Sequence, residues 1–137
     1  MQGSLSVNDI DCRPVIFGEV LYDCFPDGEA VLGGAPFNVA WHLQGLGLSP
    51  LFISRVGDDP LGHRVRDIME RRGMDTSGLQ LDSAHPTGKV NISLSGSSHS
   101  FDIIPDQAYD YIAEDALPPL PDNALFYHGS LAARNPV

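Results

Sequence analysis

At residues 33–42 the chain reads Gly-Gly-Ala-Pro-Phe-Asn-Val-Ala-Trp-His, and this stretch says most about the fold and the ligand. The two glycines can adopt positive φ and allow a ligand to approach the backbone closely. Pro36 is favoured at the first position of a helix, whose free amides attract the oxygen atoms of a ligand. Asn38 adds a side-chain donor and acceptor in the first turn. The stretch predicts a helix from about Pro36 to Leu46 with a site for a small polyhydroxylated molecule at its start.

The segments around this helix predict an α/β fold. Residues 14–21 and 51–56 are apolar runs of strand length, as in a parallel sheet that is covered on both faces. Asp59 and Pro60 form an N-cap and first-turn pair for a second helix, which Gly73 ends. Residues 124–128 are the last core strand. The order of elements predicts a Rossmann-like, mostly parallel sheet with flanking helices.

Residues 87–104 have a different pattern, which predicts a half-polar hairpin. Val90, Ile92 and Leu94 alternate with polar residues, a turn follows at residues 96–98, and residues 100–104 form the returning strand. Such alternation is typical of a sheet with one face in water. A short helix is expected at residues 107–116.

Composition and charge exclude several classes of function. The chain has 137 residues, 8 Lys and Arg, 18 Asp and Glu, and a formal net charge of −10, so it offers no basic patch for nucleic acid or an anionic membrane. It has no signal-like segment and no long apolar run, and we expect a cytoplasmic protein with Cys12 and Cys24 as free thiols. The five histidines show no metal-ligand spacing, which predicts no metal site in this chain.

Four motifs resemble the ribokinase-like carbohydrate kinases of the PfkB family, in the order that the family has them. They are residues 18–23, residues 33–42, residues 55–62 (Arg-Val-Gly-Asp-Asp-Pro-Leu-Gly) and residues 126–131 (Phe-Tyr-His-Gly-Ser-Leu). The first resembles the family's first core strand, which ends in an acid. The resemblance implies the N-terminal part of a sugar kinase domain at residues 14–131, with a small β-sheet lid formed by strands around 27–34 and 87–104. Residues 1–13 are then a tail.

The resemblance also implies a substrate site. Asp23 and Asn38 match residues that bind sugar hydroxyls, Gly33 and Gly34 match the loop beside them, and Gly129 lies at the carboxyl end of the last core strand, where α/β sheets bind ligands. Within the lid, Asn91, Phe101 and Ile103 are the candidate contacts.

Each of these residues has a simpler interpretation. Asp23 fits a turn, Gly33 and Gly34 fit an ordinary loop, and Asn38 fits a helix surface. Asp58 and Asp59 favour a turn and a helix cap over catalysis, and Trp41 favours packing over ligand stacking.

The family's chemistry is phosphoryl transfer from ATP, with Mg²⁺, to a sugar hydroxyl. Its catalytic base is the aspartate of a Gly-Ala-Gly-Asp segment, which these 137 residues do not contain. We therefore expect the base beyond Val137, no catalytic residue and no turnover in this chain alone, and a sugar as its partner. A non-catalytic sugar-binding or regulatory module is the alternative, and a nucleotide-binding domain of another class is a third hypothesis.

Residues 23–28 and 128–130 resemble those of fructokinases, which favours a ketohexose. Pro105 occupies the place where many fructokinases carry an arginine, so another hexose or a nucleoside stays open. In this family lids can pair between subunits, so the resemblance is compatible with a homodimer through the lid strands.

Overall fold

The computed structural model describes residues 12–135, in which four parallel strands form a core sheet. Its strands, in the order β5-β4-β1-β8, are β5 (Leu79–Asp82), β4 (Leu51–Gly57), β1 (Arg13–Phe17) and β8 (Ala124–His128). Val15 lies opposite Leu51 on one side and Phe126 on the other. The predicted α/β fold with a parallel sheet is confirmed. Most of the predicted tail, residues 1–11, lies outside the described residues.

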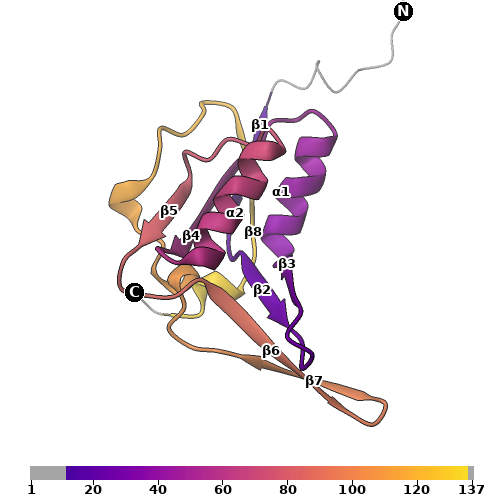
Figure 1. Cartoon of the computed structure of the whole chain (residues 1–137). Helices are drawn as coiled ribbons and strands as arrows, with labels where there is room; N and C mark the ends of the chain where they lie inside the picture. The colour runs from indigo at the N-terminus through magenta and orange to yellow at the C-terminus, as the bar shows by residue number, and fades with distance from the viewer. Residues whose placement is uncertain (1–11, 136–137) are drawn as a thin grey trace, which may run out of the picture.

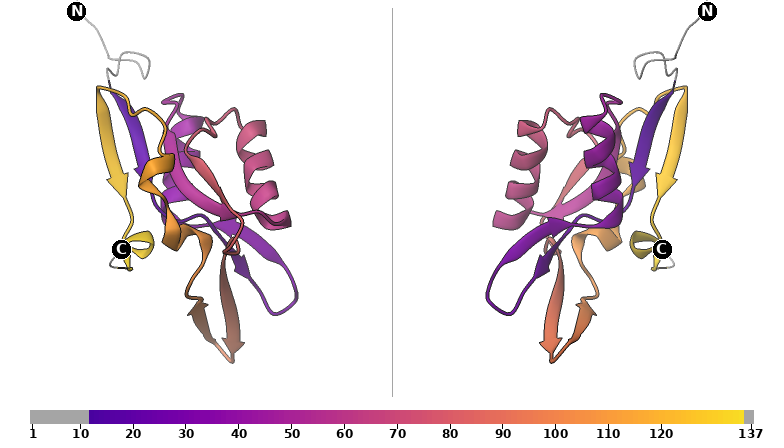
Figure 2. Two further views of the ribbon diagram at one scale, coloured as in Figure 1. Left: turned by 90° about the vertical axis from the view of Figure 1, so that its left-hand side faces the viewer. Right: turned by 90° about the vertical axis from the view of Figure 1, so that its right-hand side faces the viewer.

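The two helices α1 (Ala35–Gly45) and α2 (Pro60–Arg71) cover one face of this sheet (Figures 1 and 2). Side chains of the central strands, such as Ile16, Phe52 and Val56, pack beneath them in the main hydrophobic core. The opposite face carries Val15, Leu51 and Ile53, which contact the segment 112–117. The sheet is therefore covered on both faces near its centre, as its apolar strands require.

A second sheet extends away from the core sheet on the side where the helices begin (Figure 1). It contains β3 (Ala30–Gly33), β2 (Leu21–Cys24), β6 (Gly88–Ser95) and β7 (Ser98–Ile103), in that order. We call it the lid sheet. Only β2 and β6 are parallel; the outer pairs are antiparallel. The predicted lid strands correspond to β3, β6 and β7, and β2 joins them.

The predicted strand over residues 14–21 is wrong in its extent, because the chain leaves the core sheet after Phe17 and enters the lid sheet at Leu21. A side chain at Gly18 would collide with the ring of Pro36, so the backbone turns there against the start of α1. Residues 18–23 are consequently not one core strand, and Asp23 belongs to the lid sheet.

Three smaller differences have local causes. Strand β5 escaped prediction because it is only four residues long and buries the polar side chains of Gln80 and Asp82. The expected helix at 107–116 is two short 3₁₀ helices, η2 (Ala108–Tyr111) and η3 (Glu114–Ala116), since Ile112 is extended. Leu94 is 56% exposed, because the end of the hairpin projects beyond the core.

Candidate functional site

Three backbone segments meet where the core sheet joins the lid sheet. They are the link Gly18–Val20 between β1 and β2, the start of α1 at Gly34 and Pro36, and Gly129 after β8. A Cβ atom at Gly34, whose φ is 103°, would lie 2.8 Å from the carbonyl oxygen of Glu19. A Cβ atom at Gly129 would lie 3.0 Å from Cγ of Pro36. Glycine is therefore required at position 34, where a side chain would collide with the backbone, whereas a side chain at position 129 would need a small shift of its neighbours.

Asp23 lies next to Gly33 at this junction. Strands β2 and β3 pair so that Asp23 is opposite Val31 and Leu21 is opposite Gly33. The Oδ2 atom of Asp23 is 3.3 Å from the position that a Cβ atom of Gly33 would occupy. Burial raises the pKa of the Asp23 carboxyl group above its ordinary value. The carboxyl group is therefore partly shielded from water while it stays within reach of the loop before α1.

The start of α1 offers donors beside this carboxyl group. No side chain caps the helix, and its first turn holds no acidic residue. The amide of Asn38 already donates to the Gly34 carbonyl at 2.9 Å, whereas the first residues of a helix have no partner within it. A carboxylate that accepts from hydroxyl groups and amides that donate to them form a site suited to a polyol.

The face of the lid sheet that carries Asp23 is apolar next to this residue. Asp23 pairs with Val90, which pairs with Ile103, and paired neighbours in a sheet share a face. Ile92 and Phe101 continue this face one pair further along. Ile103 and Phe101 are 46% and 64% exposed, which leaves an apolar surface free near the carboxyl group.

Asn91, the third predicted lid residue, is on the opposite face. It pairs with Cys24 and Asp102, one position out of step with Asp23 and Ile103. The structure thus groups Phe101 and Ile103 with Asp23 and separates Asn91 from them.

Asn38 lies one turn into α1 and is exposed. It lines a shallow groove of about 320 Å³ with Val31, Leu32, Phe37, Trp41 and Ile68. Trp41 packs at the edge of the core, and the Arg72 guanidinium lies 4.1 Å from the centre of its ring. Packing thus accounts for Trp41, as the sequence suggested. Asn38 is open to solvent through the groove that Val31 and Leu32 of β3 also line.

Glu19 is a buried acid at the junction that sequence analysis did not single out. It is 6% exposed, and its Oε2 atom has no hydrogen-bond partner. That atom lies 3.3 Å from the position of a Cβ atom on Gly129. Burial raises the pKa of Glu19, against the effect of a hydrogen bond from its own backbone. The available signal was an acid inside the apolar run of residues 14–21.

Asp59 fixes the start of β6 relative to α2. Its Oδ1 atom accepts from the Gly62 amide at 2.8 Å and from the Thr87 hydroxyl at 2.7 Å, and its Oδ2 atom accepts from the Thr87 amide at 2.9 Å. The predicted N-cap is confirmed, and the same carboxylate also anchors the lid sheet at its entry.

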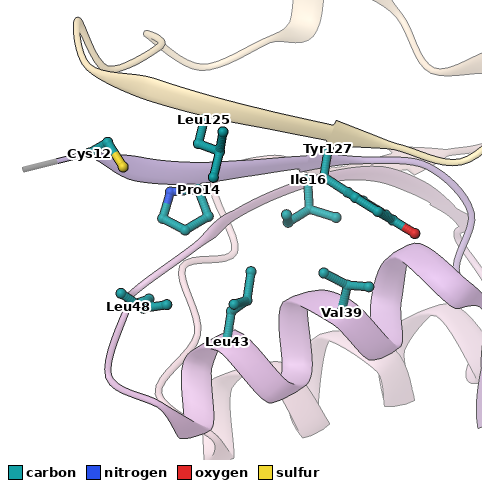
Figure 3. A pocket seen from close by; sticks show the side chains of 8 residues that line it. All are labelled: Cys12, Pro14, Ile16, Val39, Leu43, Leu48, Leu125 and Tyr127. Atoms are coloured by element: carbon teal, nitrogen blue, oxygen red, sulfur yellow. The ribbon is translucent and has the colours of Figure 1, made fainter. Parts of the chain in front are cut away.

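An apolar cavity of about 230 Å³ lies between α1 and the strands β1 and β8 (Figure 3). Aliphatic side chains such as Ile16, Val39 and Leu43 line it, and none of the predicted site residues does. It is a gap in apolar packing, distinct from the junction.

Within residues 12–135, no group of three or more His, Cys, Asp or Glu side chains is arranged to hold a metal ion. None of the helices described in this range has the length and apolarity needed to cross a membrane.

Comparison with known proteins identifies the class to which this fold and junction belong. The sequence profile of the pfkB family carbohydrate kinases matches residues 7–135. The chain belongs to this family, as its motifs suggested.

Individual relatives agree with this assignment. A fructokinase of Klebsiella pneumoniae is 36% identical over 110 residues, which are 76% of this chain and 36% of the relative. An uncharacterized sugar kinase from Pyrococcus horikoshii superposes with a TM-score of 0.79 at 32% identity, over 90% of this chain and 47% of that one. A Vibrio cholerae fructokinase solved with fructose, ADP and calcium ion gives a TM-score of 0.68 at 25% identity, over 84% and 39%. The chain therefore spans less than half the length of these relatives.

Proposed function

We propose that residues 14–131 are the sugar-binding part of a fructokinase-like carbohydrate kinase, with lid strands around 27–34 and 87–104. The observation that carries this proposal is the position of Asp23. Its carboxyl group lies beside Gly33 at the uncapped start of α1, on the lid face that holds Phe101 and Ile103. Asp23 accepts hydrogen bonds from sugar hydroxyls, helix amides donate to others, and the apolar lid covers the C–H face of the sugar. Asn38, Gly34 and Gly129 complete the site.

The proposed substrate is a ketohexose, with fructose as the first candidate. Residues 23–28 and 128–130 favour it, and the relatives above include two proteins named fructokinase. A charge-assisted hydrogen bond to a shielded carboxylate contributes about 1.5–3 kcal/mol. Asp23 thus accounts for a substantial part of the binding free energy of a small sugar.

ATP and Mg²⁺ belong to the proposal for the longer enzyme. The Vibrio cholerae relative was solved with ADP and calcium ion, and these 137 residues contain no Gly-Ala-Gly-Asp segment to supply the base. Residues 12–135 also lack a grouped set of metal ligands. We propose that this chain binds the sugar without turning it over.

Thermal melting with and without fructose tests the site. A ligand that binds only the folded state raises the melting temperature by mass action, so we expect fructose to stabilise the wild-type chain. Asp23→Asn should weaken fructose binding at least about tenfold, which corresponds to 1.4 kcal/mol. Asp67→Asn, an exposed position on α2, is the matched control and should leave the shift unchanged. Equal shifts in the wild type and Asp23→Asn would show that Asp23 is not in the site.

A further inference from the structure

Glu19 is a buried acid without a role in the proposed site and, unlike buried Asp82 and Asp110, without an ion-pair partner among the described residues. Glu19 lies close to Gly129, which follows β8, and to Gly34 at the start of α1. Gly129 is the neighbour of its carboxyl group: a Cβ atom on Gly129 would be 3.3 Å from Oε2 and 3.6 Å from Oε1, and 3.0 Å from Cγ of Pro36. Oε2 is inaccessible and has no hydrogen-bond partner, and the one hydrogen bond that acts on the pKa of the carboxyl group comes from the backbone of Glu19 itself, so no other residue explains by a hydrogen bond why an acid occupies this position.

We propose that Glu19 is a positioning residue of the sugar site: it sets the turn at Gly129 against the start of α1, and the order of that turn depends on the charge of the carboxyl group. The role in binding rests on the proposed function; the coupling between Glu19 and the turn does not.

The physical reason is the cost of a buried charge. An ionised carboxylate without a full set of donors is strongly disfavoured in a protein interior, whereas the neutral acid fits an apolar contact. Ionisation therefore draws water toward Oε2. Gly129 lies against the carboxyl group and also against Pro36 at the start of α1, so we expect water to enter by displacing the turn or the first residues of α1. Burial raises the pKa of Glu19, in keeping with a preference for the neutral form.

Titratable groups on the elements near Glu19 also bear on its titration. Tyr109 of η2 is fully buried and close enough for Glu19 to contribute to its raised pKa, and Arg134 Nη2 lies 3.5 Å from its hydroxyl. The turn itself contributes His128, whose Nδ1 atom is 2.9 Å from the Gly129 carbonyl oxygen. The first turn of α1 contributes no acid, and Asp23 on β2, four residues further along the chain, also has a pKa that burial raises.

The test is a pH titration of backbone amide resonances by NMR in the 137-residue chain. In the wild type we expect the amides of Gly129 and Ala35 to shift together at one midpoint above the ordinary value for glutamate. Glu19→Gln, which keeps the shape and stays neutral, should abolish this step, and Glu70→Gln on the exposed face of α2 should preserve it. A step caused by His128 would remain in Glu19→Gln and disappear in His128→Asn. The side-chain ¹³Cδ resonance of Glu19 gives the midpoint in the wild type without any variant.

The second arm measures fructose affinity against pH. In the wild type, affinity should fall as pH rises through the Glu19 midpoint, about tenfold for each unit by which bound sugar raises that midpoint. In Glu19→Gln this fall should be absent, and only the rise in affinity that accompanies ionisation of Asp23 should remain. If Glu19 only filled space, Glu19→Gln would lower the fructose affinity by the same factor at all pH values.

Each contrary result has a distinct meaning. The coupling between Glu19 and the turn is overturned if the amide resonances of Gly129 and Ala35 do not shift with pH in the wild type. It is also overturned if they shift in the same way in Glu19→Gln. Amide steps as expected, with the same affinity profile in both proteins, overturn its role in binding. If the wild type binds no sugar, the proposed function fails, and the amide titration still decides whether Glu19 positions the turn.

Discussion

Asp59 links a helix, a loop and a strand through one carboxylate. Burial acts to raise its pKa, but hydrogen bonds from Thr87 and Gly62 and the charge of Lys89 lower it overall. The Thr87 hydroxyl also accepts from the Gly57 amide at 2.9 Å, which extends the network to the end of β4. The carboxylate thus stabilises both the start of α2 and the entry to the lid sheet.

We expect Asp59→Ala to lower the free energy of unfolding by about 2 kcal/mol or more, because it removes a helix cap and two further hydrogen bonds. Urea denaturation measures the change. Asp58→Ala is the control: Asp58 is exposed and pairs with exposed His63 at 2.7 Å, so its loss should cost less than about 1 kcal/mol. Equal effects of the two variants would contradict the role of Asp59.

Asp82 is the second buried carboxylate that organises backbone. Burial acts to raise its pKa, but the Ala84 amide, the Arg55 side chain, and the amide and ring of His85 outweigh burial and lower the pKa to about 2. Its folded pKa lies below the unfolded value. The stabilisation is therefore complete above about pH 4 and is lost as pH falls toward 2.

Asp82→Asn should consequently lower the free energy of unfolding by about 2 kcal/mol at pH 7. The difference from the wild type should shrink as pH falls from 4 to 2, because Asp82 of the native wild type loses its charge as pH approaches its folded pKa of about 2. Urea melts at several pH values measure this. A difference that stays constant down to pH 2 would show that the charge of Asp82 is not what stabilises β5.

At the residue scale, sequence could predict side chains that act locally and could not predict those that act across the fold. Asp59 was recognisable as a cap because its partner Gly62 is three residues away. The contact between Asp82 and Arg55 spans 27 residues, and the place of Glu19 depends on Pro36 and Gly129. These contacts exist only once the two sheets are arranged.

Among the elements, the short helices η2 and η4 (Leu131–Ala133) are joined by one ion pair. Arg134 donates to both oxygen atoms of Asp110 at 2.8 and 2.7 Å, and to the Ile104 carbonyl at 2.8 Å. The Asp110 side chain is completely buried. The pair attaches the segment after β8 to the segment after the lid hairpin.

Arg134→Met should leave the Asp110 carboxylate buried without its partner, which costs about 3 kcal/mol. Hydrogen exchange should show faster exchange at residues 104–111 and 131–134, with little change in α1 and α2. Arg71→Met, at the exposed end of α2, is the control. Unchanged exchange at residues 104–111 would show that the ion pair does not hold these segments.

The elements that sequence predicted well have strong periodicity or clear ends. Strand β4, helix α2 and strand β8 begin and end within one or two residues of the predicted positions. The division of residues 14–21 between two sheets was not predictable from hydrophobicity, because both parts are apolar. What separates them is the ring of Pro36 against Gly18, a contact between residues 18 positions apart.

At the scale of the whole molecule, two sheet edges carry exposed aromatic side chains. Phe126 on β8 is 61% exposed, with Leu125 and Tyr127 exposed beside it, and Phe101 on β7 is 64% exposed. Each strand is at the edge of its sheet. Exposed edge strands with apolar side chains promote association between chains.

We expect the chain to self-associate at high concentration, and a matched pair of variants identifies the edge. If the β8 edge dominates, Phe126→Lys should shift the molecular mass measured by light scattering toward the monomer, with little effect of Phe101→Lys. The reverse result would favour the homodimer through the lid strands that the family resemblance suggested. A monomer at all concentrations would contradict both.

The ring of Pro36 lies against both Gly18 and Gly129, and the three positions are far apart in the chain. The residues at these three positions therefore cannot be substituted independently of one another during evolution. A homologue that keeps the proline has no room for a side chain at position 18, and it can accommodate a small one at position 129 only with a slight shift of the neighbouring atoms. A homologue with a smaller residue in place of the proline has more room at both positions. Among homologues, residues at these three positions should therefore change together.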